Sequence, residues 1–142
     1  MNKYFYILVL LVFNISICKS AYTTKLCNDT PSKYLEISNV TVEPYPLVPG
    51  HNVTLQIQGK LIKPIEHGSV RITGKYLFIR VINEQLDICS KDLECPIPIG
   101  PFVFSYSSSL PPWLPSGKFY GEISAKDGSS ESITCVNFSV DL

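Results

Sequence analysis

The sequence predicts an all-β fold, specifically an immunoglobulin-like antiparallel β-sandwich of about seven strands. Short segments alternate between apolar and polar residues, and Pro- and Gly-containing turns separate them. No stretch of ten or more residues has the apolar spacing of an amphipathic helix. Short alternating strands without helices are typical of a two-sheet sandwich.

The N-terminus is predicted to be a signal peptide, residues 1–20. Lys3 precedes an apolar run from Tyr4 to Phe13, and Cys18-Lys19-Ser20 places small residues where a signal peptidase acts. A membrane anchor is the alternative, but the run is shorter than the roughly 20 residues that span a bilayer. We therefore expect a domain of residues 21–142 that is secreted or delivered to the endolysosomal lumen.

Charge in the expected mature chain is nearly balanced. Loss of Lys3 and Lys19 leaves ten basic residues against twelve acidic ones, a net charge near −2. Proteins that bind nucleic acid concentrate positive charge on one face, so we expect no nucleic-acid partner. Scattered lysines (Lys60, Lys63 and Lys75) could meet an anionic phosphate or form a solvated face.

The first strands are predicted on either side of a Pro-rich turn. Residues 35–42 alternate with a slip at Ser38-Asn39, which indicates a bulge or a break between two short strands. Pro44-Tyr45-Pro46 and Pro49-Gly50 form the turn. Residues 51–58 then alternate without interruption and predict a half-buried strand whose inner face carries Val53, Leu55 and Ile57.

Residues 69–82 are apolar on both faces. Leu77, Ile79 and Val81 alternate with Tyr76 and Phe78. A strand of this kind is usually central and covered twice, or it lines a cavity. We therefore expect one long strand here.

The remaining strands follow in quick succession. One carries Phe102, Phe104 and Tyr106 on a single face, and residues 118–126 form the next, ended by a hairpin turn at Asp127-Gly128. The last strand, residues 133–142, changes its apolar phase, which predicts a bulge near Cys135. Prolines in residues 110–115 exclude a central strand, so Trp113 is expected on a loop.

The cysteines and histidines do not form a known catalytic or metal-binding pattern. Cys27, Cys89, Cys95 and Cys135 make two disulfides in one of three pairings, and Cys89 with Cys95 would close a short loop. Their spacing matches neither zinc sites nor Cys-x-x-Cys redox pairs. Motifs of nucleophilic and phosphate-binding enzymes are also missing, so we expect no enzyme, no metal and no cofactor.

Four sequons predict N-glycosylation of the mature chain. A glycan on a strand requires that its asparagine face water, so the sequons also predict strand orientation. The acceptor residues are Asn28, Asn39, Asn52 and Asn137.

Three stretches of the sequence resemble the ML lipid-recognition family. They are residues 42–55, with Pro44-Tyr45-Pro46 and Pro49-Gly50; Cys89 and Cys95 followed by Pro96-Ile97; and residues 113–120 leading on to Cys135-Val136. The resemblance covers essentially the whole mature chain. Within the family, the chain is most similar to the phosphatidylglycerol/phosphatidylinositol transfer proteins, and it is related to the lysosomal cholesterol carrier of Niemann-Pick type C disease.

The resemblance implies a fold, a pairing of cysteines and a function. The two sheets would hold a lipid between them, and the disulfides would be Cys27–Cys135 and Cys89–Cys95. The function would be transfer of phospholipid, with sterol as a further ligand, by noncovalent enclosure during transient membrane contact. We expect a monomer. The alternative is an extracellular protein-interaction domain with a filled core, since packed interiors are the rule.

Two sets of residues are candidates for the lipid site. Inward apolar positions would line the cavity: Val53, Leu55, Ile57, Leu77, Ile79, Phe102, Phe104, Tyr106, Phe119, Ile123 and Ile133. Apolar residues on proline-held loops would form its mouth and touch the membrane. These are Ile97, Ile99, Pro101, Trp113 and Leu114.

Overall fold

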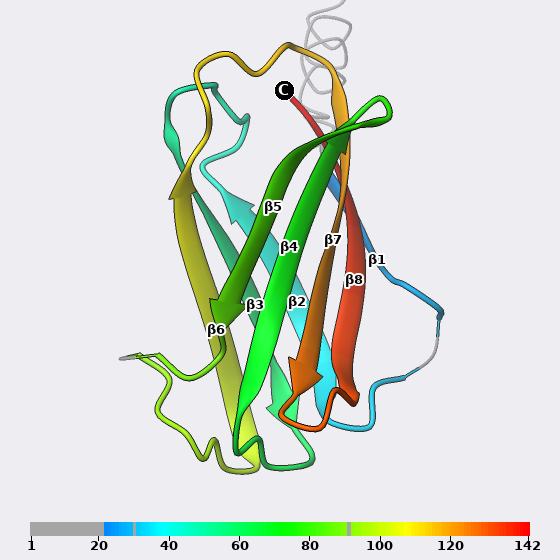
Figure 1. Cartoon of the computed structure of the whole chain (residues 1–142), viewed down its shortest axis with the longest axis vertical. Coiled ribbons are helices and arrows are strands. Elements are labelled where there is room, and N and C mark those ends of the chain that lie inside the picture. The colour runs from blue at the N-terminus through cyan, green and yellow to red at the C-terminus, as the bar shows by residue number, and fades with distance from the viewer. Residues whose placement is uncertain (1–21, 30, 91) are drawn as a thin grey trace, which may run out of the picture.

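The computed structural model describes residues 22–29, 31–90 and 92–142, which form eight β-strands (Figure 1). The predicted signal peptide lies outside the described residues. The strands are β1 (Tyr22–Leu26), β2 (Leu35–Glu43), β3 (Asn52–Leu61), β4 (Gly68–Tyr76), β5 (Ile79–Asp87), β6 (Gly100–Ser109), β7 (Lys118–Asp127) and β8 (Ser132–Asp141). Within this part of the chain, no helix is long and apolar enough to cross a membrane.

The strands form two antiparallel sheets that face each other, which confirms the predicted β-sandwich. One sheet has the order β1-β8-β7-β4-β5 and the other the order β2-β3-β6. The chain therefore crosses between the sheets in the connections β1–β2, β3–β4, β5–β6 and β6–β7. The first three crossings lie at the lower end of the sandwich in Figure 1, together with the β7–β8 hairpin, and only β6–β7 crosses at the upper end.

We name the two ends by their contents. The disulfide end comprises residues 31–34, 61–67, 88–90, 92–99 and 127–131, and it contains the Cys89–Cys95 bridge. The cavity end comprises residues 44–51, 77–78 and 110–117. Each end has its own cluster of buried side chains, and the cluster toward the disulfide end includes the nearly inaccessible Leu61, Ile65, Ile88, Ile123 and Ile133.

The expectation of one long strand over residues 69–82 is wrong. The segment is a hairpin in which β4 ends at Tyr76 and β5 begins at Ile79, with Leu77 in the left-handed region at φ 55°. Leu77, Phe78 and Ile79 are 68%, 99% and 67% exposed, so they do not face the interior. The sequence of an exposed apolar hairpin tip can be as apolar as that of a central strand. Alternation alone therefore does not distinguish the two.

Both predicted bulges are present. The β2–β3 register shifts between Ile37 and Asn39, as the slip in the sequence predicts. In the β7–β8 pair, Ala125 faces Thr134 and Lys126 faces Ser132, so the extra residue is Ile133, two residues before Cys135. The bulge allows both Ile133 and Thr134 to be buried.

The four predicted glycosylation asparagines are all exposed. Asn28 follows β1, and Asn39 and Asn52 lie on β2 and at the start of β3. Asn137 faces outward on β8, opposite Lys25 and Glu122. Their exposure is compatible with glycosylation, which stays a prediction.

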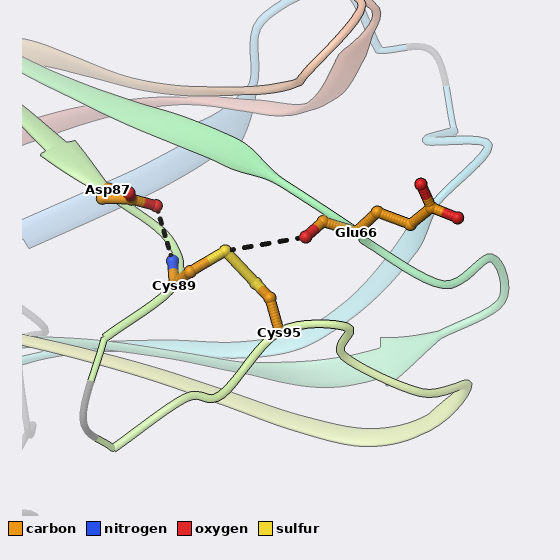
Figure 2. Close-up of a disulfide and its surroundings, with 4 residues drawn as sticks. All are labelled: Glu66, Asp87, Cys89 and Cys95. Carbon is orange, nitrogen blue, oxygen red and sulfur yellow. Dashed lines mark hydrogen bonds between the residues drawn. A yellow bond between two sulfur atoms is a disulfide. The ribbon is translucent and has the colours of Figure 1, made fainter.

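Both disulfides have the pairing that the family resemblance implies. Cys27 pairs with Cys135 and joins the end of β1 to β8, and Cys89 pairs with Cys95 in the β5–β6 connection. In Figure 2, the Cys89 N–H donates to Asp87 Oδ1 over 2.8 Å, and Cys89 Sγ lies 3.9 Å from the Glu66 carbonyl oxygen. The latter is a simple contact, because a sulfur in a disulfide carries no proton. Two disulfides in a chain of this size are typical of an oxidising compartment outside the cytosol.

A polar cluster closes the disulfide end. The hydroxyl of Tyr34, a residue that is only 2% exposed, donates to Asp127 Oδ2 and lies 3.0 Å from Glu131 Oε2. Lys63 Nζ donates to the same hydroxyl over 2.7 Å, lies 4.1 Å from the Tyr34 ring centroid and pairs with Glu131 at 3.4 Å. Lys63 is therefore engaged far from the cavity end and is not placed to meet a ligand there.

Candidate functional site

The candidate site is a cavity of about 390 Å³ between the two sheets, toward the cavity end. Its walls are mainly apolar and come from both sheets and from the loops of that end. Five of the predicted residues line it: Val53, Leu55, Tyr106, Phe119 and Leu114. Its volume lies within the roughly 300–1,000 Å³ of typical small-molecule sites.

The register of the strands explains how these side chains meet. In the smaller sheet, Leu55 of β3 faces Tyr106 of β6, and both point inward. In the larger sheet, Gly121 of β7 faces Phe138 of β8. A Cβ added at Gly121 would lie 2.1 Å from Phe138 Cζ, so the missing side chain allows the Phe138 ring to lie against the sheet beside the cavity.

Sequence reasoning missed most of the remaining wall. Some of these residues lie on predicted strands but were not assigned to the cavity, and others depend on the β4–β5 hairpin, whose turn was not recognised. They are Tyr22, Val42, Leu47, Ile72, Gly74, Val81, Ile82, Asn83, Glu84, Ser108, Ser109, Leu110, Pro111, Phe138, Val140 and Leu142. The turn at residues 77–78 and the register shift between Gly74 and Lys75 together place Ile82 and Glu84 opposite the inward-facing Gly74 and Ile72.

Five other predicted cavity residues lie in the packed core instead. They are inward-facing, but the space among them is only about 20 Å³. They belong to the cluster toward the disulfide end, where side chains from both sheets fill the interior. These residues are Ile57, Phe102, Phe104, Ile123 and Ile133. The sandwich is therefore solid at one end and hollow at the other.

The predicted mouth is split between the two ends. Ile97 is 4% exposed and forms a bridge with Ile65 in the packed core, whereas Ile99 and Pro101 are exposed at the disulfide end. The assignment of these three residues to a mouth is wrong, because the cavity lies at the opposite end. Trp113 is 65% exposed at the cavity end, while Leu114 is buried and lines the cavity.

A polar rim lies between the two strands that edge the cavity on one flank. β5 and β6 are outer strands of different sheets and are not hydrogen-bonded to each other. Asn83 and Glu84 of β5, and Ser108 and Ser109 of β6, line the cavity here. Glu84 is the only charged side chain among the described lining residues.

One grouping of possible metal ligands occurs in the described part of the chain. Ligand atoms of Cys27, Glu122 and Cys135 lie within 4.8 Å of one another. Both sulfurs belong to the Cys27–Cys135 disulfide, and metals bind the thiolate form of cysteine. Of the three residues, only the Glu122 carboxylate is therefore available as a metal ligand.

Comparison with known proteins identifies the family. Residues 21–142 match the family model of the ML domain. The chain belongs to the ML domain family. A chain of Dictyostelium discoideum that is named as a phosphatidylglycerol/phosphatidylinositol transfer protein is 30% identical to this ML protein over 139 residues, which cover 96% of this chain and 99% of that one.

Two solved structures share the fold of this ML protein. A Niemann-Pick type C2 protein from Japanese carpenter ant superimposes with a TM-score of 0.67 and 14% identity, over 84% of this chain and 98% of that one. Chicken MD-1, solved in complex with lipid IVa, superimposes with a TM-score of 0.59 and 13% identity, over 84% of this chain and 88% of that one. At such identities, the likeness shows the sandwich fold.

Proposed function

We propose that this ML protein binds a single lipid in the cavity and transfers it between membranes without covalent chemistry. The observation that carries the proposal is the apolar cavity of about 390 Å³ between the sheets. Relatives named as phosphatidylglycerol/phosphatidylinositol transfer proteins support a phospholipid ligand. The product would act outside the cytosol, in a secreted or endolysosomal location.

The energetic reason for such a carrier is the cost of exposing lipid chains to water. A phospholipid with two chains exposes roughly 30 methylenes at about 0.8 kcal/mol each, or on the order of 25 kcal/mol. A dry apolar cavity removes most of this cost during transit. The mainly aliphatic and aromatic walls of the cavity are suited to that role.

The volume of the cavity limits what it holds in the described conformation. Because an apolar cavity of about 150 Å³ accommodates benzene, with six carbons, a cavity of about 390 Å³ accommodates on the order of 16 carbons. That is one acyl chain or most of a sterol. A two-chain phospholipid would therefore require the sheets to move apart at the cavity end.

Membrane contact would occur through the apolar hairpin tip and the neighbouring loop. Leu77, Phe78 and Ile79 are exposed at the tip, and Trp113 is exposed on the β6–β7 loop. The tip and the loop are adjacent, because the Tyr76 hydroxyl donates to the Ser116 carbonyl oxygen over 3.4 Å. Exposed apolar patches of this kind mark protein or membrane contacts.

The rival function is an extracellular protein-interaction domain with a filled core. The packed half of the molecule fits that alternative, but the cavity at the other end does not, because well-packed interiors contain few voids larger than a water molecule. Loops at the cavity end could still contact a protein partner.

Native mass spectrometry of the protein secreted by its own cells tests the proposal. We expect a mass increment equal to one lipid, which lipid extraction then identifies. The delipidated protein should accelerate exchange of labelled phosphatidylglycerol between vesicles. A chain that is consistently empty and does not accelerate exchange would refute the carrier function.

A further inference from the structure

We propose that the cavity, in the described conformation, takes a single-chain lipid with an ammonium headgroup, which Glu84 binds at the rim. The inference rests on the proposed lipid-carrier function and adds a ligand class to the same cavity. Two independent observations carry it. They are the volume of the cavity and the single charged side chain among its described lining residues.

The volume of the cavity fits one hydrocarbon chain. By the ratio for benzene in an apolar cavity of about 150 Å³, a cavity of about 390 Å³ accommodates on the order of 16 carbons. A ligand with one chain of this length fills the cavity while the sheets keep the described arrangement. Fatty acids, fatty alcohols and long-chain amines all have such a chain, so the headgroup decides among them.

Glu84 lies where the headgroup of such a chain would emerge. The β4–β5 register places Glu84 opposite Ile72, a buried residue that lines the cavity. β5 is the outer strand of its sheet and is not hydrogen-bonded to β6, so Glu84 lines the cavity and is still exposed to solvent. A chain that lies among the apolar walls would therefore leave its polar end beside this carboxylate.

No cation among the described residues neutralises Glu84. Its carboxylate has no hydrogen bond or ion pair in this part of the molecule. The basic side chains of the β4–β5 hairpin lie on its outer face, where Arg71 donates to Gln85 over 3.0 Å. Lys75 and Arg80 face each other on that same outer face. The charge of the Glu84 carboxylate is therefore available to a ligand.

A carboxylate at the rim distinguishes the three headgroups by their charge. Opposite charges about 4 Å apart in water attract enough to favour binding about fivefold, and like charges disfavour it by a similar factor. Glu84 therefore attracts an ammonium and repels the carboxylate of a fatty acid. A fatty alcohol donates one hydrogen bond but has no Coulomb attraction, so it lies between the two.

The other polar side chains of the rim supply acceptors for the remaining ammonium protons. An ammonium group has three donors and no acceptor. The hydroxyls of Ser108 and Ser109 and the amide oxygen of Asn83 accept hydrogen bonds, and all three residues line the cavity. Asn83 and Glu84 belong to one sheet and the serines to the other. The rim thus offers an ammonium group acceptors from both sheets.

Competition among three lipids with the same chain length tests the proposal. Delipidated full-length secreted protein is incubated at about pH 8 with phosphatidylcholine vesicles that contain equal traces of hexadecylamine, hexadecanol, hexadecanoic acid and phosphatidylglycerol. At this pH the amine is protonated, as lysine is. The lipids that co-purify with the protein are then quantified. Because delivery from the vesicles is the same for every variant, a change in the amine-to-alcohol ratio reports the headgroup site.

We expect Glu84→Gln to lower the amine-to-alcohol ratio at least about threefold relative to the wild type. Glu84→Asp, which keeps the charge, should retain most of the ratio. Glu84→Lys should shift the preference toward hexadecanoic acid. Glu122→Gln is the matched control, because it removes the same charge from the outer face of the same sheet and should leave the ratio unchanged.

The outcomes separate this proposal from the carrier function. An amine-to-alcohol ratio that is the same in Glu84→Gln and in the wild type would overturn the role of Glu84. Uptake of phosphatidylglycerol without any of the three single-chain lipids would overturn the ammonium site and leave the carrier function in place. A wild-type protein that takes up none of the lipids would overturn the carrier function itself.

Discussion

The Tyr34 hydroxyl donates a hydrogen bond to Asp127 Oδ2 over 2.5 Å, and this bond joins the start of β2 to the end of β7 in the opposite sheet. The bond lowers the pKa of the Asp127 carboxyl and raises the pKa of the Tyr34 hydroxyl. The bond lies at the disulfide end, where three of the four connections between the sheets are found. The folded state at this end is therefore sensitive to pH.

Asp127 should make the folded state less stable at acidic pH. Because the pKa of Asp127 is lowered from its ordinary 3.8, its stabilising contribution is present above that value and is lost as pH falls through the lowered pKa. We expect Asp127→Asn to flatten the acid decline of the melting temperature below about pH 4. Asp92→Asn, a change of an exposed carboxylate outside the cluster, is the control. Equal acid declines in wild type and Asp127→Asn would contradict the prediction.

The second prediction compares the hollow end with the solid one. Val53→Phe adds volume to the cavity wall, so bound lipid measured by native mass spectrometry should fall while the melting temperature stays near that of the wild type. Ile57→Phe adds a smaller volume, but to the packed core on the same strand, where overpacking typically costs about 1–3 kcal/mol. Equal destabilisation by both changes would show that the space beside Val53 is not available to a ligand.

The third prediction concerns the exposed apolar tip. Phe78→Ser should slow lipid transfer between vesicles but leave the bound lipid unchanged, and the stability should change by no more than about 0.5 kcal/mol, as at most surface sites. Trp113→Ala should behave in the same way. Ile99→Ser is the matched control, since Ile99 is an exposed apolar residue at the opposite end. Slower transfer by Ile99→Ser alone would place the membrane contact at the disulfide end.

The fourth prediction separates the two disulfides. The residues of Cys27–Cys135 are 108 apart and those of Cys89–Cys95 are 6 apart. In the chain-entropy model, loops of these lengths correspond to about 4.7 and about 2 kcal/mol. The double change of Cys27 and Cys135 to Ser should therefore lower the denaturation midpoint more than the double change of Cys89 and Cys95. The reverse order would indicate that the short bridge has a larger structural role than its loop length implies.

Local sequence patterns predicted much of the fold and only part of the site. Alternation placed Val53 and Leu55 correctly, because a half-buried strand has a period of two. It failed at Leu77 and Ile79, where neither Gly, Asn nor Pro marks the turn. Glu84 was missed because the expected strand ended at Ile82, whereas β5 continues to Asp87 and its register places Glu84 opposite Ile72.

The hollow half of the sandwich could not be predicted from the strands themselves. Ile57 and Leu55 lie two residues apart on the same face of β3, yet one belongs to the packed core and the other lines the cavity. What differs is the distance between the sheets at each level, which depends on side chains from many strands. Proline-held apolar loops likewise occur at both ends, so they did not indicate which end was open.

The unequal distribution of sheet-crossing connections determines how the molecule can open. Three connections and the Tyr34–Asp127 hydrogen bond hold the sheets together at the disulfide end. At the other end, a single strap, residues 110–117, runs from one sheet to the other and carries both Trp113 at its surface and Leu114 beneath it. Displacement of residues 110–117 would let the two sheets separate at the cavity end, and the proposed membrane contact of Trp113 lies on this same segment.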